Sequence, residues 1–504
     1  MIPLLGLKQE RLTEISVANI WKFVLALGCA MLLFRFFPPL AFALAALVVV
    51  AALRGQATIA FYALLLIPTL NFTNWVLCPQ TIAFELAARL VFILLCFVLL
   101  LQASAVRERY HVLEPFGWLI GYAVVMLLLS PASYVPAVSA AKAVFFLFFI
   151  GTQLALVSVM LHKQIHPGPV RSAVLAIACF LILGSLLTVP FPAIGYSMVA
   201  QAAAMGNASL LDDTYGLFNG VTYHSQALGT VLAILNAFLL SDYLFNLRSG
   251  GKLHQVLLCC IPVLIFYSSC RTGMLAYLGS TLIVWFFLMR NRQVPARKRR
   301  TVQGIFLLGC LALALGLATS QSLRAGASNF LQKKTSKEEQ YVADQGQSLS
   351  EILTASRLDI AKDELATFYA HPVFGIGFQV SEELRERSFT SFKDFFSTQI
   401  EKGVTPTMIL EESGVVGATI IFVFLFTLYT TLLRRQCYCF LSTFSTFLML
   451  NMGEATLFSP SAGGGMFWTL CFCALLLDLH RIRYNRTKSR PQEALGTQAN
   501  WTFG

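Results

Sequence analysis

A few cations in this sequence stand inside or beside long apolar segments. Arg271 lies between two apolar runs, among small Ser, Thr and Gly neighbours, and Arg89 and Lys142 lie about two turns into two other runs. Ionised groups are costly at a membrane boundary unless they are paired, hydrated or used. We interpret the accessible Arg271 as functional. For Arg89, an ion pair with Glu85 four residues earlier is as favoured as a functional role. For Lys142, a snorkelling side chain is favoured over a functional role.

Arginines near a lipid surface are suited to diphosphate chemistry. A guanidinium binds phosphate oxygens bidentately and keeps its charge, so it can stabilise a diphosphate leaving group. No carboxylate cluster typical of a metal site stands beside these arginines, and the pair Asp212-Asp213 is more typical of a solvated loop. The sequence therefore predicts chemistry without a metal or a cofactor.

Another arginine, Arg357, stands in the one long polar stretch of the chain. Apolar residues recur after it at helical spacing, and Ser356 with Asp359 fits a capped helix start, while Pro372 fits a stop just beyond His371. We expect an amphipathic helix of about fourteen residues. A cation in its first turn opposes the helix dipole, which hints that Arg357 has a function.

The elements that must position these residues are apolar helices. The chain has 504 residues, of which 57% are hydrophobic and 12% charged, and its mean hydropathy is +0.70. These values predict an all-α polytopic membrane protein with about 14 transmembrane helices (12 to 14). The apolar runs lie near 18–36, 38–53, 57–74, 82–102, 115–130, 138–161, 170–188, 223–245, 253–269, 271–289, 302–320, 408–433, 437–453 and 463–480.

One polar insert divides the chain. We expect a membrane domain with spans 1 to 11 at 1–320, a large outer loop with short amphipathic helices at 321–407, the last three spans at 408–480 and a basic tail at 481–504. No internal repeat shows, and the position of the insert argues against the related halves that many transporters have.

If the spans cross the membrane in alternating directions, the Lys and Arg residues of the short connections all lie on one side of it. The main groups of these residues lie within 290–300, 434–435 and 481–490. That side is cytoplasmic by the positive-inside tendency, so both termini are cytoplasmic and the large loop is extracytoplasmic. The net charge of +12 is then a topology signal, and no nucleic-acid partner is expected. The first 17 residues favour an uncleaved anchor, and the cysteines within spans favour small buried side chains.

Four segments carry a resemblance to a known family. Ser269 to Gly273 resembles the S-R-[GST] turn of the O-antigen ligase and O-antigen polymerase superfamily, and Arg357 to Gly377 resembles its arginine, helix and H-P-x-F-G-x-G signature. Leu410 to Gly417 resembles its glutamate and glycine pattern, and Gly216 to His224 stands where the family has a G-x-F segment. The architecture matches over about 60–480, and the motifs over about forty residues.

The resemblance implies a bacterial inner-membrane glycosyltransferase that takes a glycan from undecaprenyl diphosphate on the outer face, for cell-surface polysaccharide such as O-antigen or exopolysaccharide. Its partners would be that donor, a glycan or lipid acceptor, and membrane lipids. By the same resemblance Arg271 would contact the donor diphosphate and Arg357 would hold donor or acceptor. Candidates for further substrate binding are Arg89, Lys142, His224, Tyr215 and Glu411.

The sequence departs from the family at one place. Ligases typically carry a histidine in an H-N motif before the span that follows the outer loop, whereas this chain reads Gly403 to Met408 there. A general base must reach the acceptor hydroxyl. The candidates are Glu411, Glu412, His371 and His224. A helix-end role is favoured over catalysis for His371, and the two roles are balanced for Glu412. The departure favours a polymerase, or a ligase for another acceptor.

The main alternative is a lipid-linked oligosaccharide flippase or another multi-pass transporter. A transporter should have charges near the membrane midplane, pseudo-symmetric halves and no sizeable outer domain. The sequence favours the enzyme. A sensor or scaffold that binds a partner through its insert has no support beyond the insert itself.

Overall fold

The described part of the chain is a bundle of helices. The computed structural model describes residues 17–74, 77–78, 82–106, 110–165, 167–195, 218–246, 252–268, 270–291, 294–296, 298–300, 302–303, 349–381, 404–453, 455–459 and 462–499. These ranges hold no β-strand, only an isolated bridge between Thr73 and Thr222. Helices satisfy their backbone hydrogen bonds internally, which an apolar chain in lipid requires.

Thirteen of the fourteen predicted apolar runs coincide with helices. These are α2 (Val17–Phe36), α3 (Pro38–Leu53), α4 (Ala57–Asn71), α5 (Ile82–Ser104), α6 (Phe116–Leu129), α7 (Pro136–His162), α8 (Pro167–Thr188), α12 (Ser225–Ser241), α13 (Lys252–Ser268), α14 (Arg271–Arg290), α20 (Thr405–Arg434), α21 (Tyr438–Leu450) and α22 (Ala462–Ala499). Apart from its first two residues, the run 302–320 lies outside the described residues.

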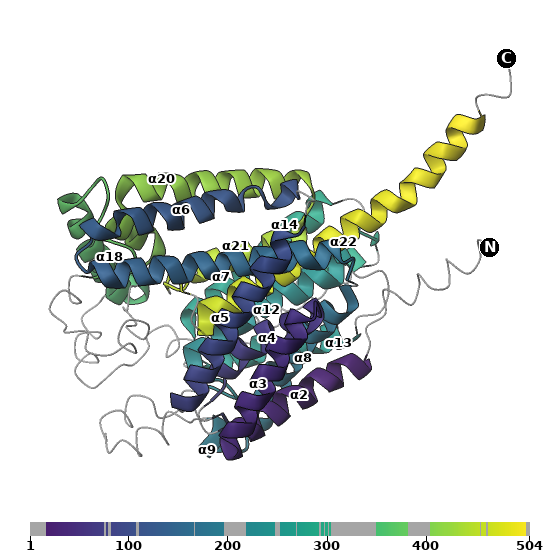
Figure 1. Ribbon diagram of the computed structural model, residues 1–504, viewed down its shortest axis with the longest axis horizontal. Helices are drawn as coiled ribbons and strands as arrows, with labels where there is room; N and C mark the ends of the chain where they lie inside the picture. The colour runs from purple at the N-terminus through teal and green to yellow at the C-terminus, as the bar shows by residue number, and fades with distance from the viewer. Residues whose placement is uncertain are drawn as a thin grey trace.

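Length and composition confirm a multi-pass membrane protein. Within the described residues, six helices are long and apolar enough to cross a bilayer, in the regions 136–162, 167–188, 225–246, 272–290, 405–434 and 463–483, and further apolar helices are shorter. The number of spans stays a prediction. In Figure 1, α20 and α6 lie side by side along one edge of the bundle, and the last turns of α22 extend away from it.

Helices α12 and α14 run parallel and begin at the same end of the bundle. Cys270 Sγ contacts the carbonyl of Gln226, and Asn236 donates to Ser280 Oγ (2.9 Å), each pair 44 residues apart in sequence. Between these contacts the backbones meet, because a Cβ at Gly273 would lie 2.6 Å from the carbonyl carbon of Gly229.

Helix α20 begins at that end too. The N–H of Thr405 donates to the carbonyl of Asn451 (3.0 Å), and a Cβ at nearby Gly453 would lie 3.0 Å from the Thr272 side chain. The turn after α21 therefore lies between the starts of α14 and α20. We call this end, where α12, α14 and α20 begin, the motif end. Helix α6 runs antiparallel to α20 and reaches the motif end with its last turn.

The opposite end, where α14 and α20 finish at Arg290 and Arg434, is called the basic end. It contains a buried charge network that the sequence did not predict, because the partners of Arg171 lie far from it in the chain. Arg171 is 5% exposed and binds Asp242 through two contacts (2.8 and 3.1 Å), while His254 Nε2 lies 3.2 Å from the same carboxylate. A buried arginine needs such a partner.

Lys298, in the connection after α14, joins the same region. Its ammonium donates to the carbonyl of Tyr243 (2.9 Å) and lies 4.9 Å from the centre of that ring. Burial lowers the pKa of Lys298, and Asp242 partly offsets this effect. Arg171 and Lys298 at this end thus bind groups of other segments and help to hold the helices together.

The close approach of α12 and α14 gives a test of the fold. We expect Gly273→Ala to lower the thermal unfolding temperature in detergent, because the new methyl group forces the two backbones apart, at a cost of about 1–3 kcal/mol. Gly121→Ala is the matched control, since a Cβ there meets nothing within 4 Å. Equal unfolding temperatures for the two variants would contradict the parallel packing.

Candidate functional site

Helix α18 (Leu349–Ala370) carries the predicted arginine, but it is longer than expected. It begins before Ser356, so the prediction of a capped start at that residue is wrong. A Ser and an Asp three residues apart are compatible with a helix interior, and Glu351 stands in the actual first turn, where acidic residues are favoured. Arg357 is therefore an interior helix residue, and the argument from the helix dipole does not apply to it.

The segment after α18 exchanges backbone hydrogen bonds with α20. In an unbroken helix the N–H groups of residues 415 and 416 would donate to the carbonyls of residues 411 and 412. Here Glu411 and Glu412 accept instead from residues 376 and 377 (both 3.0 Å), and Val415 and Val416 donate to the carbonyls of residues 372 and 373 (2.9 and 3.3 Å). We call these four bonds the α20 junction.

Glycines make the α20 junction possible. Gly414 breaks the helix with φ +58° and ψ −163°, and Gly375 and Gly377 also have positive φ. A Cβ on Gly375 or Gly414 would lie closer than 3.0 Å to backbone atoms across the junction, and one on Gly377 would overlap Ser133. Any larger residue would push the two segments apart. Gly375 and Gly414, one from each of two sequence motifs, are thus explained by one contact.

His371 holds the same segment to the turn before α7. Its Nε2 lies 2.7 Å from the hydroxyl of Tyr134, and the backbone N–H of Tyr134 donates to the carbonyl of Ile376 (2.9 Å). The rings meet edge to face. His371 therefore stands at the end of α18 as a helix-end residue with a defined partner.

Lys142 contacts the segment after α18 at a point beyond Gly377. Its side chain is 9% exposed, and its ammonium donates to the carbonyl of Gln379 (3.1 Å). Gln379 has a positive φ of 51°, and its amide donates to the carbonyl of Phe458 (2.6 Å). The charge that the sequence placed inside a span thus contacts the backbone next to the α20 junction.

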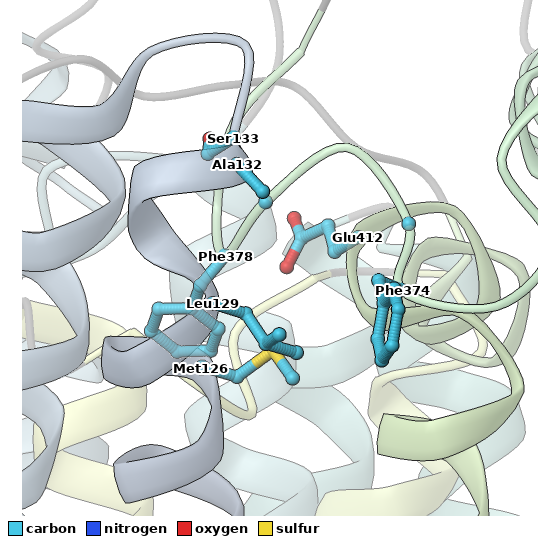
Figure 2. Close-up of a pocket in the computed structure, with 9 residues that line it drawn as sticks. Met126, Leu129, Ala132, Ser133, Phe374, Phe378 and Glu412 are labelled. Atoms are coloured by element: carbon cyan, nitrogen blue, oxygen red, sulfur yellow. The ribbon is translucent and has the colours of Figure 1, made fainter.

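Glu412 points into a small cavity beside the α20 junction. The cavity has a volume of about 10 Å³, roughly the space of one water molecule, and its walls include Met126, Leu129, Ser133 and Phe378 (Figure 2). The Glu412 side chain is 1% exposed, and Glu411 is also buried. A carboxylate so far from bulk water is costly, which makes it a candidate for a functional role.

Another buried carboxylate at this end was missed in the sequence. Glu364, on α18, is 4% exposed and accepts a hydrogen bond from the hydroxyl of Thr407 at the start of α20. Thr407 lies in the stretch where ligases typically have a histidine. Glu364 also follows Arg357 by seven residues, which puts the two positions on one face of α18, roughly 10 Å apart. That spacing is the signal that could have indicated Glu364.

Arg271 is the first residue of α14. Cys270 precedes it as the cap and accepts from the N–H of Gly273 (3.2 Å), and Thr272 lies beside the turn that holds the start of α20. His224 caps α12 in the same way, with its Nδ1 accepting from the N–H of Gln226 (3.0 Å). Because α12 and α14 are parallel, both caps lie at the motif end.

Residues 256–408 match the family model described as O-antigen ligase. We call these residues the O-antigen ligase region. The match confirms the resemblance to the O-antigen ligase and polymerase superfamily, whose activity is of the glycosyltransferase type, with a lipid-linked glycan and an acceptor in a membrane. No curated protein matches the chain.

The O-antigen ligase region runs from within α13 to the first residues of α20. It includes the Arg271 turn and the segment from Arg357 to the α20 junction, and it ends just before Glu411 and Glu412. Arg271, His371, Glu411 and Glu412 are brought to the motif end, around the start of α20. Lys142 lies beside them, and His224 lies at the same end on α12.

One predicted residue, Arg89, lies outside this group, and another lies outside the described residues. Arg89 lies in the second turn of α5, which packs chiefly against α7 and α3. Tyr215 lies outside the described residues.

The α20 junction predicts a strong effect of Gly414→Ala. The added methyl group would overlap the backbone of residues 373 and 374, so we expect faster limited proteolysis after α18 and loss of glycan product. Gly117→Ala is the control, because a Cβ there meets nothing within 4 Å. A fully active Gly414→Ala variant with unchanged proteolysis would show that the junction is dispensable.

Proposed function

We propose that this O-antigen ligase region transfers or polymerises a glycan from undecaprenyl diphosphate at the outer face of a bacterial inner membrane. Arg271 and Arg357 would bind the donor diphosphate, and Glu412 would take the proton of the acceptor hydroxyl. The observation that carries the proposal is the meeting of three motif segments at the start of α20. These are the Arg271 turn, the segment after α18, and the glutamate and glycine pattern around the α20 junction.

The electrostatics of the motif end support the binding of an anion. Helices α12, α14 and α20 all begin there, and the N-terminus of a helix carries partial positive charge and N–H groups that favour phosphate. Arg271 stands at one of these N-termini. Arg357 stands on the face of α18 that also carries Glu364, whose partner Thr407 belongs to α20. A diphosphate near the start of α20 would thus meet positive charge from two sides.

The proposed step is a substitution at the anomeric carbon of the donor glycan. The oxygen of the acceptor hydroxyl attacks that carbon, and the bond from the carbon to the diphosphate oxygen breaks. The electron pair of the broken bond leaves with undecaprenyl diphosphate, where guanidinium charge stabilises it. The hydroxyl proton goes to a carboxylate, Glu412 in the first instance, with Glu364 as a second group at the same helix start.

The distribution of cations supports the proposed orientation. If the basic end is cytoplasmic, both termini are cytoplasmic and the motif end faces outward. A span at 302–320 would then return the chain from the basic end, where α14 finishes, to the motif end, where α18 packs against α20. The proposed outer loop at 321–407 would include α18, between membrane domains at 1–320 and 408–480, with a basic tail at 481–504.

The acceptor distinguishes the two activities. A ligase would pass the glycan to a lipid A core sugar, and a polymerase to another lipid-linked repeat unit. Where ligases typically have their H-N motif, this chain has Thr407 paired with Glu364. This difference favours a polymerase, or a ligase that uses another acceptor.

The lipid-linked glycans of a deletion strain test the proposal. Accumulated single repeat units would identify a polymerase, and full-length polymer on the carrier would identify a ligase. We expect Arg271→Ala, Arg357→Ala and Glu412→Gln to restore the normal profile poorly, with product formation reduced by about 10²–10³-fold, because each removes charge stabilisation or proton transfer. Arg300→Ala, an exposed arginine at the basic end, is the control and should restore the profile fully.

Two results would reject the proposal. One is full restoration by both arginine variants at normal membrane abundance. The other is glycan that stays on the cytoplasmic leaflet of the deletion strain, which would identify a flippase instead.

A further inference from the structure

A polar groove lies at the basic end, far from the motif end, between the start of α6 and the last turns of α20. Its volume is about 570 Å³, within the range of about 300–1,000 Å³ typical of small-molecule sites. Arg434 and Arg435 line it from α20, together with the threonines Thr427 and Thr431, and Trp118 lines it from α6.

Two positive charges in the groove are available for a ligand. Arg434 is exposed and Arg435 half-buried. Among the described residues, neither guanidinium makes a hydrogen bond or an ion pair. The acidic residue of the groove, Glu114, is already matched by His111 at 2.5 Å, and both side chains are largely exposed. The groove therefore favours an anion.

The surroundings of the groove are those of a lipid boundary. Phe422 and Phe426 are four residues apart, which places them on one face of α20, and Arg434 follows about two turns later. The two phenylalanines are 68% and 62% exposed, so they present an apolar surface on α20 before the helix reaches its cations. Trp118, which lines the groove, is 48% exposed, and tryptophan is enriched where a membrane meets water.

We propose that this groove binds the headgroup of an anionic phospholipid. Arg434 and Arg435 bind the phosphate, the threonine hydroxyls and the Trp118 indole face the rest of the headgroup, and an acyl chain lies along Phe426 and Phe422. Guanidinium groups suit phosphate because they bind it bidentately. Basic pockets between membrane helices bind lipid headgroups by this chemistry. The site is independent of the proposed transfer reaction.

The test uses the full chain purified in detergent and measures thermal unfolding against added phosphatidylglycerol, phosphatidylcholine or inorganic phosphate. Phosphatidylglycerol is expected to stabilise the wild type, and Arg434→Gln with Arg435→Gln to weaken its apparent affinity roughly tenfold or more. Arg54→Gln with Arg300→Gln is the matched control, because it removes two exposed cations elsewhere at the basic end. This control is expected to bind like the wild type.

Three results would overturn the proposal. Equal losses in the two double variants would mean general attraction to a charged surface. Equal stabilisation by phosphatidylcholine would mean no recognition of charge, and equal stabilisation by inorganic phosphate would mean a free-anion site.

A second double variant, Arg434→Lys with Arg435→Lys, keeps the test decisive if the glutamine variant does not fold. This variant keeps the charge but loses bidentate binding, so it should bind phosphatidylglycerol with intermediate affinity, and wild-type affinity would contradict the assigned role of the guanidinium groups.

Discussion

Four backbone hydrogen bonds between α20 and the segment after α18 hold the motif end in its arrangement. The break at Gly414 leaves two carbonyls and two N–H groups of α20 without helical partners, and buried backbone groups need partners. The segment from Pro372 to Gly377 supplies all four. Because the bonds run in both directions, neither segment can shift without unpairing the other. The break in the helix is therefore satisfied only by one register of the incoming chain, which fixes where α18 ends relative to Glu412.

The other elements of the motif end depend on this arrangement. Glu364 of α18 meets Thr407 one helical turn before the α20 junction, and the turn at 451–453 contacts both Thr272 and Thr405. The start of α14, with Arg271, is thereby held to the start of α20 through backbone and small side chains. Lys142 and His371 brace the segment from the side of α7. A set of weak motifs, distant in sequence, thus becomes one region with a buried carboxylate at its centre.

The helices were largely predictable because apolar length is a local signal, and thirteen runs coincide with helices. Arg271 at the start of α14 was predictable for the same reason. The α20 junction was not, because it depends on backbone pairing between segments whose residues give no periodic signal. The start of α18 was misplaced, since a Ser and an Asp at that spacing also suit a helix interior. The burial of Glu364 and Arg171 was not predicted, because only packing shows that Thr407 and Asp242 are their partners.

The most direct measurement of the central claim is turnover by the purified protein with an undecaprenyl diphosphate-linked glycan. The account predicts one undecaprenyl diphosphate released for each glycosidic bond formed, and a loss of about 10²–10³-fold in Glu412→Gln, which keeps the shape of the side chain but cannot accept the proton. Wild-type turnover by a folded Glu412→Gln variant that also carries Glu364→Gln would contradict the account, because neither carboxylate to which the account assigns the proton would then serve the reaction.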